Sequence, residues 1–265
     1  MKTILILVTL LYVGLFTSGC GLISKKYTKS DSREYTFNSE NKKKLRLENI
    51  NGDITISRSS DSGSLKIKAY MEIKVRKKYL NTPFDEINIE IDTNTNEIIV
   101  KTDITNKGSD DFFNIGRSQK VDYNIYIPEN LNLEIDNTNG DVFTGNISNN
   151  IEIHNVNGSA DFKSFHGKLL CEITNGSVSG EIDSTRGINI DLVNGSITLK
   201  LSNYLNAYLK AETVNGRVTE ENLELKDVIK DKKKLKAKIG YPDSESEINL
   251  ETINGKIKLL GFKDI

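Results

Sequence analysis

Tryptophan is absent from this chain of 265 residues, and there are only two histidines, two cysteines and three prolines. Neither histidine has a cysteine or a second histidine at the spacing that zinc sites use. The Gly-x-Ser-x-Gly nucleophile motif and the glycine-rich phosphate-binding loops are missing too. We therefore expect no enzyme activity, and we predict no catalytic residue, metal or cofactor.

An excess of charge is also missing, since 36 basic residues stand against 37 acidic ones. The chain has no global positive field that would attract nucleic acid, so we expect no nucleic-acid partner. Apart from the N-terminus, no segment of the sequence is apolar enough to span a bilayer.

The N-terminus reads as a signal peptide. Lys2 supplies the positive charge, an apolar run follows over residues 4–16, and small residues precede Cys20. This run has the length of a signal-peptide core and is too short for a transmembrane helix. Residues 15–20 (Leu-Phe-Thr-Ser-Gly-Cys) resemble a bacterial lipobox, although Thr17 stands where Leu is usual. A plain secretory signal or an uncleaved anchor is the alternative.

Cys20 is therefore the predicted lipid attachment site, with residues 1–19 removed. Its thiol would form a thioether to diacylglycerol, and its freed amine could take a further acyl chain such as palmitate. We expect a lipoprotein of the bacterial cell envelope, anchored to a membrane and lying outside the cytoplasm. Only Cys171 then remains, so no intramolecular disulfide is available, and we expect Cys171 to be a small core residue.

The mature chain is expected to have two parts. Residues 20–43 comprise the lipidated cysteine and a polar, charged stretch that we interpret as a tether. Residues 44–265 show strand patterns and no helical period, so we assign them to one all-β domain.

An internal repeat built on Asn-Gly dominates this domain. The dipeptide occurs at Asn51-Gly52, Asn139-Gly140, Asn157-Gly158, Asn175-Gly176, Asn194-Gly195, Asn215-Gly216 and Asn254-Gly255. In all seven copies the residues six and four positions before the Asn, and two after the Gly, are apolar. This alternation places one face inside, and a fixed repeat of this length indicates one coil per repeat, stacked on its neighbours.

The fold class we predict is a parallel β-solenoid, or β-helix-like repeat. A meander of antiparallel hairpins would also use Asn-Gly turns, but it explains the matching flanks less well. Glycines near the return, such as Gly167 and Gly187, fit a second corner. Residues 65–75, 87–91 and 97–102 predict additional antiparallel strands near the N-terminus. Residues 221–247, which are rich in lysine over 226–238, predict an insertion that extends one coil or loops out.

Part of the sequence resembles a known family. Residues 121–128 (Val-Asp-Tyr-Asn-Ile-Tyr-Ile-Pro), then residues 131–135 and 139–142, resemble the bacterial putative-adhesin domain of unknown function. The likeness extends over roughly residues 45–260. It implies a β-solenoid on an envelope protein, and it implies neither an enzyme activity nor catalytic residues.

One polar row stands out. Three residues before each Asn-Gly come Glu48, Asp136, His154, Glu172, Asp191, Glu212 and Glu251. All should point outward and recur about every 4.8 Å in stacked parallel coils. We interpret them as a solubilising face; the alternative is a weak divalent-cation or basic-ligand surface. His154 and His166 are expected to be solvated, as are Asp110 and Asp111 in a polar loop.

These features favour a non-catalytic surface module that binds an unknown protein or glycan. An envelope-stress or regulatory component is the first alternative. A polysaccharide-active enzyme is the second, although it would need convergent carboxylates that the sequence does not suggest.

Overall fold

The computed structural model describes residues 5–6, 26–76, 84, 86–105, 118–241 and 246–262. Every regular element within them is a β-strand, and the strands form two large sheets. In these ranges there is no helix long and apolar enough to cross a membrane. The predicted all-β class is confirmed.

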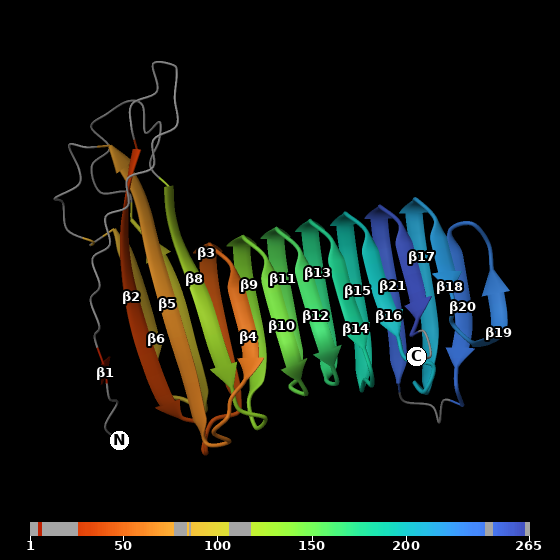
Figure 1. The fold of residues 1–265 in the computed structure, drawn as a ribbon, viewed down its shortest axis with the longest axis horizontal. Coiled ribbons are helices and arrows are strands. Elements are labelled where there is room, and N and C mark those ends of the chain that lie inside the picture. The colour runs from red at the N-terminus through yellow and green to blue at the C-terminus, as the bar shows by residue number, and fades with distance from the viewer. Residues whose placement is uncertain are drawn as a thin grey trace.

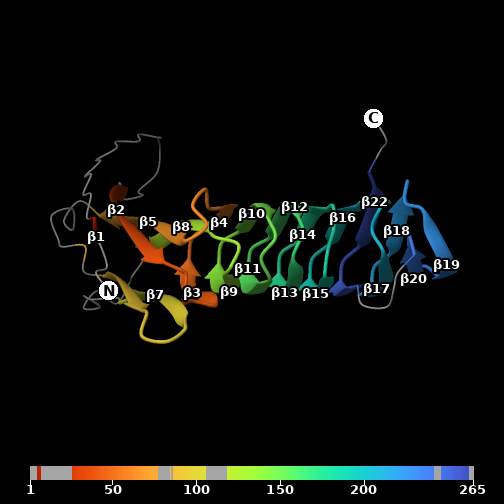
Figure 2. The ribbon, with the colours of Figure 1, turned by 90° about the horizontal axis from the view of Figure 1, so that it is seen from below.

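The two sheets lie face to face as two layers (Figure 2). Sheet A runs in the order β1 (Leu5–Ile6), β2 (Lys26–Asn38), β5 (Ser64–Arg76), β8 (Ser118–Ile127), β4 (Ile54–Arg58), β10 (Val142–Ile147), β12 (Ala160–Phe165), β14 (Val178–Ile182), β16 (Ile197–Leu201), β22 (Ile257–Gly261) and β18 (Val218–Glu221). Sheet B runs in the order β19 (Leu225–Lys230), β20 (Lys234–Ile239), β17 (Ala207–Asn215), β21 (Glu247–Asn254), β15 (Gly187–Asn194), β13 (Lys168–Asn175), β11 (Ile151–Asn157), β9 (Asn132–Asn139), β3 (Lys44–Asn51), β7 (Glu97–Ile104) and β6 (Ile87–Asp92).

Each Asn-Gly unit is one coil that gives a strand to each sheet, and successive coils form an elongated stack (Figure 1). The strands β3, β9, β11, β13 and β15 pair in parallel, with Asn51, Asn139, Asn157, Asn175 and Asn194 in register. The parallel pairing confirms the β-solenoid and excludes the hairpin meander for these units.

The order of the last two coils differs from a simple succession. The strand β21 lies between β15 and β17, and β22 likewise lies between β16 and β18. The seventh unit is therefore inserted between the fifth and the sixth (Figure 1). The strand β17 pairs with β21 on one edge and with the antiparallel strand β20 on the other, so β21 and β17 together link β15 to β20.

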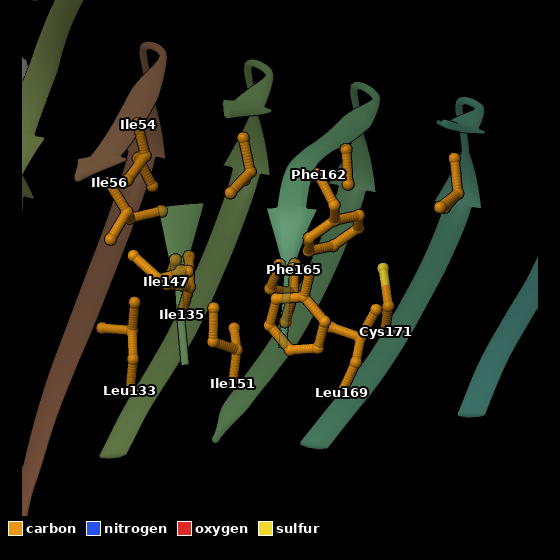
Figure 3. Packing of buried hydrophobic residues seen from close by; sticks show 14 of the residues in the cluster. Ile54, Ile56, Leu133, Ile135, Ile147, Ile151, Phe162, Phe165, Leu169 and Cys171 are labelled. Carbon is orange, nitrogen blue, oxygen red and sulfur yellow. The ribbon is translucent and has the colours of Figure 1, made fainter. Parts of the chain in front are cut away.

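The core is a set of apolar ladders between the sheets (Figure 3). All of the apolar positions that the repeat predicts are buried, none of them more than 3% exposed. Phe162 and Phe165 fill the space between the layers in an edge-to-face contact, with ring centroids 5.8 Å apart. Cys171 is a free, buried member of the ladder, as predicted, and burial raises the pKa of its thiol.

The Asn-Gly corner is built from two further ladders. The Asn side chains form a continuous chain of amide hydrogen bonds, in which Asn157 Nδ2 donates to Asn139 Oδ1 at 2.9 Å and Asn175 Nδ2 donates to Asn157 Oδ1 at 3.0 Å. The glycines bring successive backbones into contact, because a Cβ on Gly158 would lie 2.0 Å from the carbonyl oxygen of Gly140. The dipeptide thus serves stacking as well as turning.

The N-terminal part is confirmed as partly antiparallel. The strand β5 pairs antiparallel with both β2 and β8, and β6 pairs antiparallel with β7. By contrast, β7 pairs in parallel with β3 and β8 in parallel with β4. These two strands therefore form one more coil without an Asn-Gly corner.

The tether prediction is wrong for residues 26–38. These residues form β2, which pairs with β5 along its whole length. The aromatic side chains of Tyr35 and Phe37 are buried in the core, at 6% and 7% exposure. The charged residues of β2 suggested a tether. They form a strand because the edge of β5 pairs with their backbone groups, and because alternate side chains of β2 face the core.

At the other end, the lysine-rich insertion is a hairpin of β19 and β20 that extends sheet B beyond β17. Cys20, Asp110 and Asp111 lie outside the described residues, as does most of the predicted signal peptide. Within that peptide, Leu5 and Ile6 form the short strand β1 against β2.

Candidate functional site, a groove along sheet B

The outer face of sheet B carries a groove of about 1020 Å³ beside the Asn-Gly corners. It runs along the stack and crosses eight strands: β7, β3, β9, β11, β13, β15, β21 and β17. Because every coil presents the same positions to it, the groove is lined by rows of equivalent residues.

One of these rows is the predicted acidic one, which the register confirms. Following sheet B from β7 to β20, each residue pairs with the next in the order Lys101, Glu48, Asp136, His154, Glu172, Asp191, Glu251, Glu212 and Lys234. Lysine therefore flanks the row on both sides, with Glu90 of β6 paired beyond Lys101, which the spacing of the Asn-Gly pairs did not reveal.

Basic side chains neutralise both ends of this acidic row. At the β7 end, Arg46 lies 3.2 Å from Glu48 and 3.1 Å from Asp136. At the other end, Lys210 lies 2.6 Å from Glu251, while Lys234 pairs with Glu212 and lowers the pKa of that carboxyl.

His154 interrupts the row and is more engaged than the sequence predicts. Its Nδ1 lies 3.1 Å from Glu172 Oε2 and its Nε2 lies 3.0 Å from Glu152 Oε1. Partial burial opposes protonation of the ring, but the hydrogen bonds to the two glutamates outweigh it and raise the pKa of His154. The imidazolium form, which donates from both nitrogens, fits this position best.

Near the middle of the row, Asp191 lies between Glu172 and Glu251 and has no ion pair within 4 Å among the described residues. The Asp191 carboxylate accepts a hydrogen bond of 2.8 Å from the Asn189 amide. Partial burial, followed by repulsion from Glu251 and Glu172, raises the pKa of Asp191. A positively charged ligand would relieve this repulsion.

A second row runs parallel to the acidic one, at the residue directly before each Asn-Gly. Its members are all β-branched: Ile50, Thr138, Val156, Thr174, Val193, Ile253 and Val214. Val156, Val193, Ile253 and Val214 are 40% to 57% exposed, although they belong to regular strands. Val156, Val193, Ile253 and Val214 form the exposed apolar row. It was not among the sequence-based predictions, although a β-branched residue before every Asn-Gly signals it.

The groove does not gather ligands for a metal. Within the described residues, no group of three or more His, Cys, Asp or Glu side chains is placed to hold a metal ion. In-register strands keep neighbouring carboxylates side by side along a line, so they do not converge on one point. His166 lies at the return corner, where its Nδ1 is 3.0 Å from Ser184 Oγ, and it takes no part in the groove.

The sequence matches no protein-family model. It also matches no curated protein.

Among solved structures, the chain is similar to a putative cell adhesion protein from Clostridium sporogenes, with 17% identity and a TM-score of 0.48 over 88% of this chain and 100% of the other. It is also similar to a putative adhesin from Bacteroides fragilis, with 14% identity and a TM-score of 0.39 over 88% of this chain and 97% of the other. A putative lipid binding protein from Parabacteroides distasonis aligns at 15% identity and a TM-score of 0.27, again over 88% and 97%. Membership of the putative-adhesin family stays a prediction.

Proposed function

We propose that this protein is a non-catalytic binding module of the bacterial cell envelope, held on a membrane through lipid on Cys20, with the sheet B groove as its binding surface. The observation that carries the proposal is the exposed row of Val156, Val193, Ile253 and Val214 inside the groove. Exposed apolar side chains gathered in one depression are typical of a surface that a partner covers.

The strand β2 makes the proposed anchor short. Six residues, 20–25, separate the start of the mature chain from the strand that begins at Lys26. Fully extended, they span about 20 Å. The end of the stack that holds β2 would therefore be held close to the membrane surface.

Anchoring is tested by comparing the chain with its Cys20→Ala variant in a bacterium that processes lipoproteins. We expect the wild type in the membrane fraction, with diacylglycerol on an N-terminal Cys20 detected by mass spectrometry. We expect the variant to lose the lipid. An unmodified Cys20 in a mature, membrane-bound protein would overturn the anchor.

Binding and the absence of catalysis are tested together. The lipidated protein is presented to arrays of glycans and envelope proteins, and in parallel it is incubated with a panel of polysaccharides. We expect a bound partner whose affinity falls in the Val156→Thr/Val193→Thr variant, and no release of reducing ends. Turnover of any polysaccharide would overturn the non-catalytic part of the proposal. An affinity that is the same for the wild type and the groove variant would show that the groove is not the binding surface.

A further inference from the structure

We propose that the occupant of the sheet B groove is a cationic amphipathic helix, presented by a peptide or by an exposed segment of a protein. This inference rests on the proposed binding function and names the partner class of the same surface. The inference is based on one feature: the acidic row and the exposed apolar row run side by side along the groove.

The acidic row determines the sign of the partner's charge. Arg46 neutralises one end of the row, and Lys210 neutralises Glu251 and Glu212 at the other. His154 lies 3.1 Å from Glu172, and Asp191 is the next carboxylate in register. In the described part of the chain, no ion pair reaches Asp191 within 4 Å. A partner with Lys or Arg at its centre would supply the missing countercharge.

The apolar row determines the rest of the partner's chemistry. Val156 and Val193 each stand two residues along the strand from an acidic-row position, His154 and Asp191 respectively. Two residues of a strand span about 6.6 Å, so both rows lie within reach of one element about 10 Å wide. A helix with a cationic flank next to an apolar flank matches both rows at once.

The repeat distance favours a helix over an extended segment. The rows advance about 4.8 Å per coil. A helix presents side chains on one face about every 5.4 Å, one turn for each coil, whereas same-face side chains of an extended strand recur about every 6.6 Å. From Glu48 to Glu212 the row crosses seven coils, or about 29 Å, which corresponds to a helix of about 19 residues.

The test uses the lipidated chain in phosphatidylcholine nanodiscs, with empty nanodiscs as the blank. The probe is a fluorescent 20-residue helical peptide with lysines on one flank and leucines on the adjacent one. A scrambled peptide of the same composition and a peptide with two central prolines serve as peptide controls. Binding is measured by fluorescence anisotropy in low and high salt, because salt screens charge pairs beyond about 10 Å.

We expect the helical peptide to bind, with an affinity that falls at least tenfold in the Glu172→Gln/Asp191→Asn variant and severalfold in Val156→Thr/Val193→Thr. The matched control is Asp161→Asn/Glu181→Gln, which removes the same charge from the outer face of sheet A and should leave binding unchanged. Melting temperature and circular dichroism of each variant confirm that it is folded.

Several results would overturn the inference. They are equal binding of the scrambled peptide, equal weakening in the sheet A control, or no peptide binding in low salt. A further result to test by sedimentation is oligomers of the wild type that are lost in the groove variants. That result would identify the occupant of the groove as the lysine-rich β19–β20 hairpin of a second copy and would overturn the inference. If a glycan or another protein binds through the groove while the peptide does not, the helix is excluded and the proposed function stands.

Discussion

At the residue scale, the glycine of each Asn-Gly pair is required for space as well as for conformation. Gly158 has a φ of 142°, which side chains rarely tolerate. A Cβ there would also lie 2.0 Å from the backbone oxygen of Gly140 in the coil below. The glycine therefore couples the turn to the stacking distance.

Replacing Gly158 with Ala is expected to lower the free energy of unfolding by about 3 kcal/mol or more, because backbone strain and a clash with backbone act together. The control is Gly145→Ala in β10, where an added Cβ meets nothing within 4 Å. We expect that variant to change stability by less than about 1 kcal/mol. Urea denaturation of both variants provides the comparison, and equal losses would contradict the account of the corner.

The other residue-scale prediction concerns pH and His154. The pKa of this imidazole is raised in the folded protein, so folding favours the protonated form. Its contribution is fully present below about pH 6.5, the ordinary value, and is lost as the pH rises through the higher folded pKa. We expect His154→Gln to destabilise the protein more at pH 5.5 than at pH 8.5, as measured by urea denaturation at both values. A pH-independent difference would show that Glu152 and Glu172 do not hold the charge.

At the element scale, β2 shows how a strand can look like a linker. Its sequence, KYTKSDSREYTFN, is dominated by polar and charged residues. Packing is nevertheless provided by Tyr35 and Phe37, which face the core, while β5 satisfies the backbone along 13 paired positions. The strand thus depends on a partner more than on its own composition.

Because Phe37 of β2 is buried in the core, Phe37→Ala should lower the free energy of unfolding by about 3 to 4 kcal/mol, as buried Phe-to-Ala substitutions do. The neighbouring Thr36 is exposed and serves as the control. We expect Thr36→Ala to stay within about 0.5 kcal/mol of the wild type. Thermal and denaturant unfolding would measure both, and a negligible effect of Phe37→Ala would restore the tether interpretation.

At the scale of the whole molecule, the seventh unit closes the stack from within. The strand β21 pairs with β15 on one side and β17 on the other. The last unit in the sequence therefore lies between two units that precede it in the chain. This arrangement ties the C-terminal coil to both neighbours and leaves the β19–β20 hairpin at the end of sheet B.

Engineered disulfides test this order. Asn249 is the register partner of both Asn189 and Lys210, so Cys pairs at 189/249 and at 210/249 should cross-link. A pair at 189/210 spans two coil spacings, about 9.6 Å, and should not, since disulfides require Cα atoms within about 7 Å. Cys171 is buried and will not interfere. Peptide mapping under non-reducing conditions reads out the bonds, and a 189/210 link alone would indicate consecutive stacking.

The sequence by itself determined the coil. Seven Asn-Gly pairs with apolar residues at fixed offsets specified parallel strands, their register, the buried ladders including Cys171, and the outward row from Glu48 to Glu212. These follow from local periodicity, because an alternating pattern decides which side chains face inward and equal repeats stack with equal positions aligned.

Only the tertiary structure decided which edges meet. Seven near-equivalent units can pair in several orders, and the structure places β21 between β15 and β17 while β20 occupies the other edge of β17. Long-range pairing also turned the charged residues 26–38 into β2 and placed Lys101 and Lys234 at the two ends of the acidic row. The repeat determines the conformation of each coil, and the pairing of strand edges determines the position of each coil in the stack.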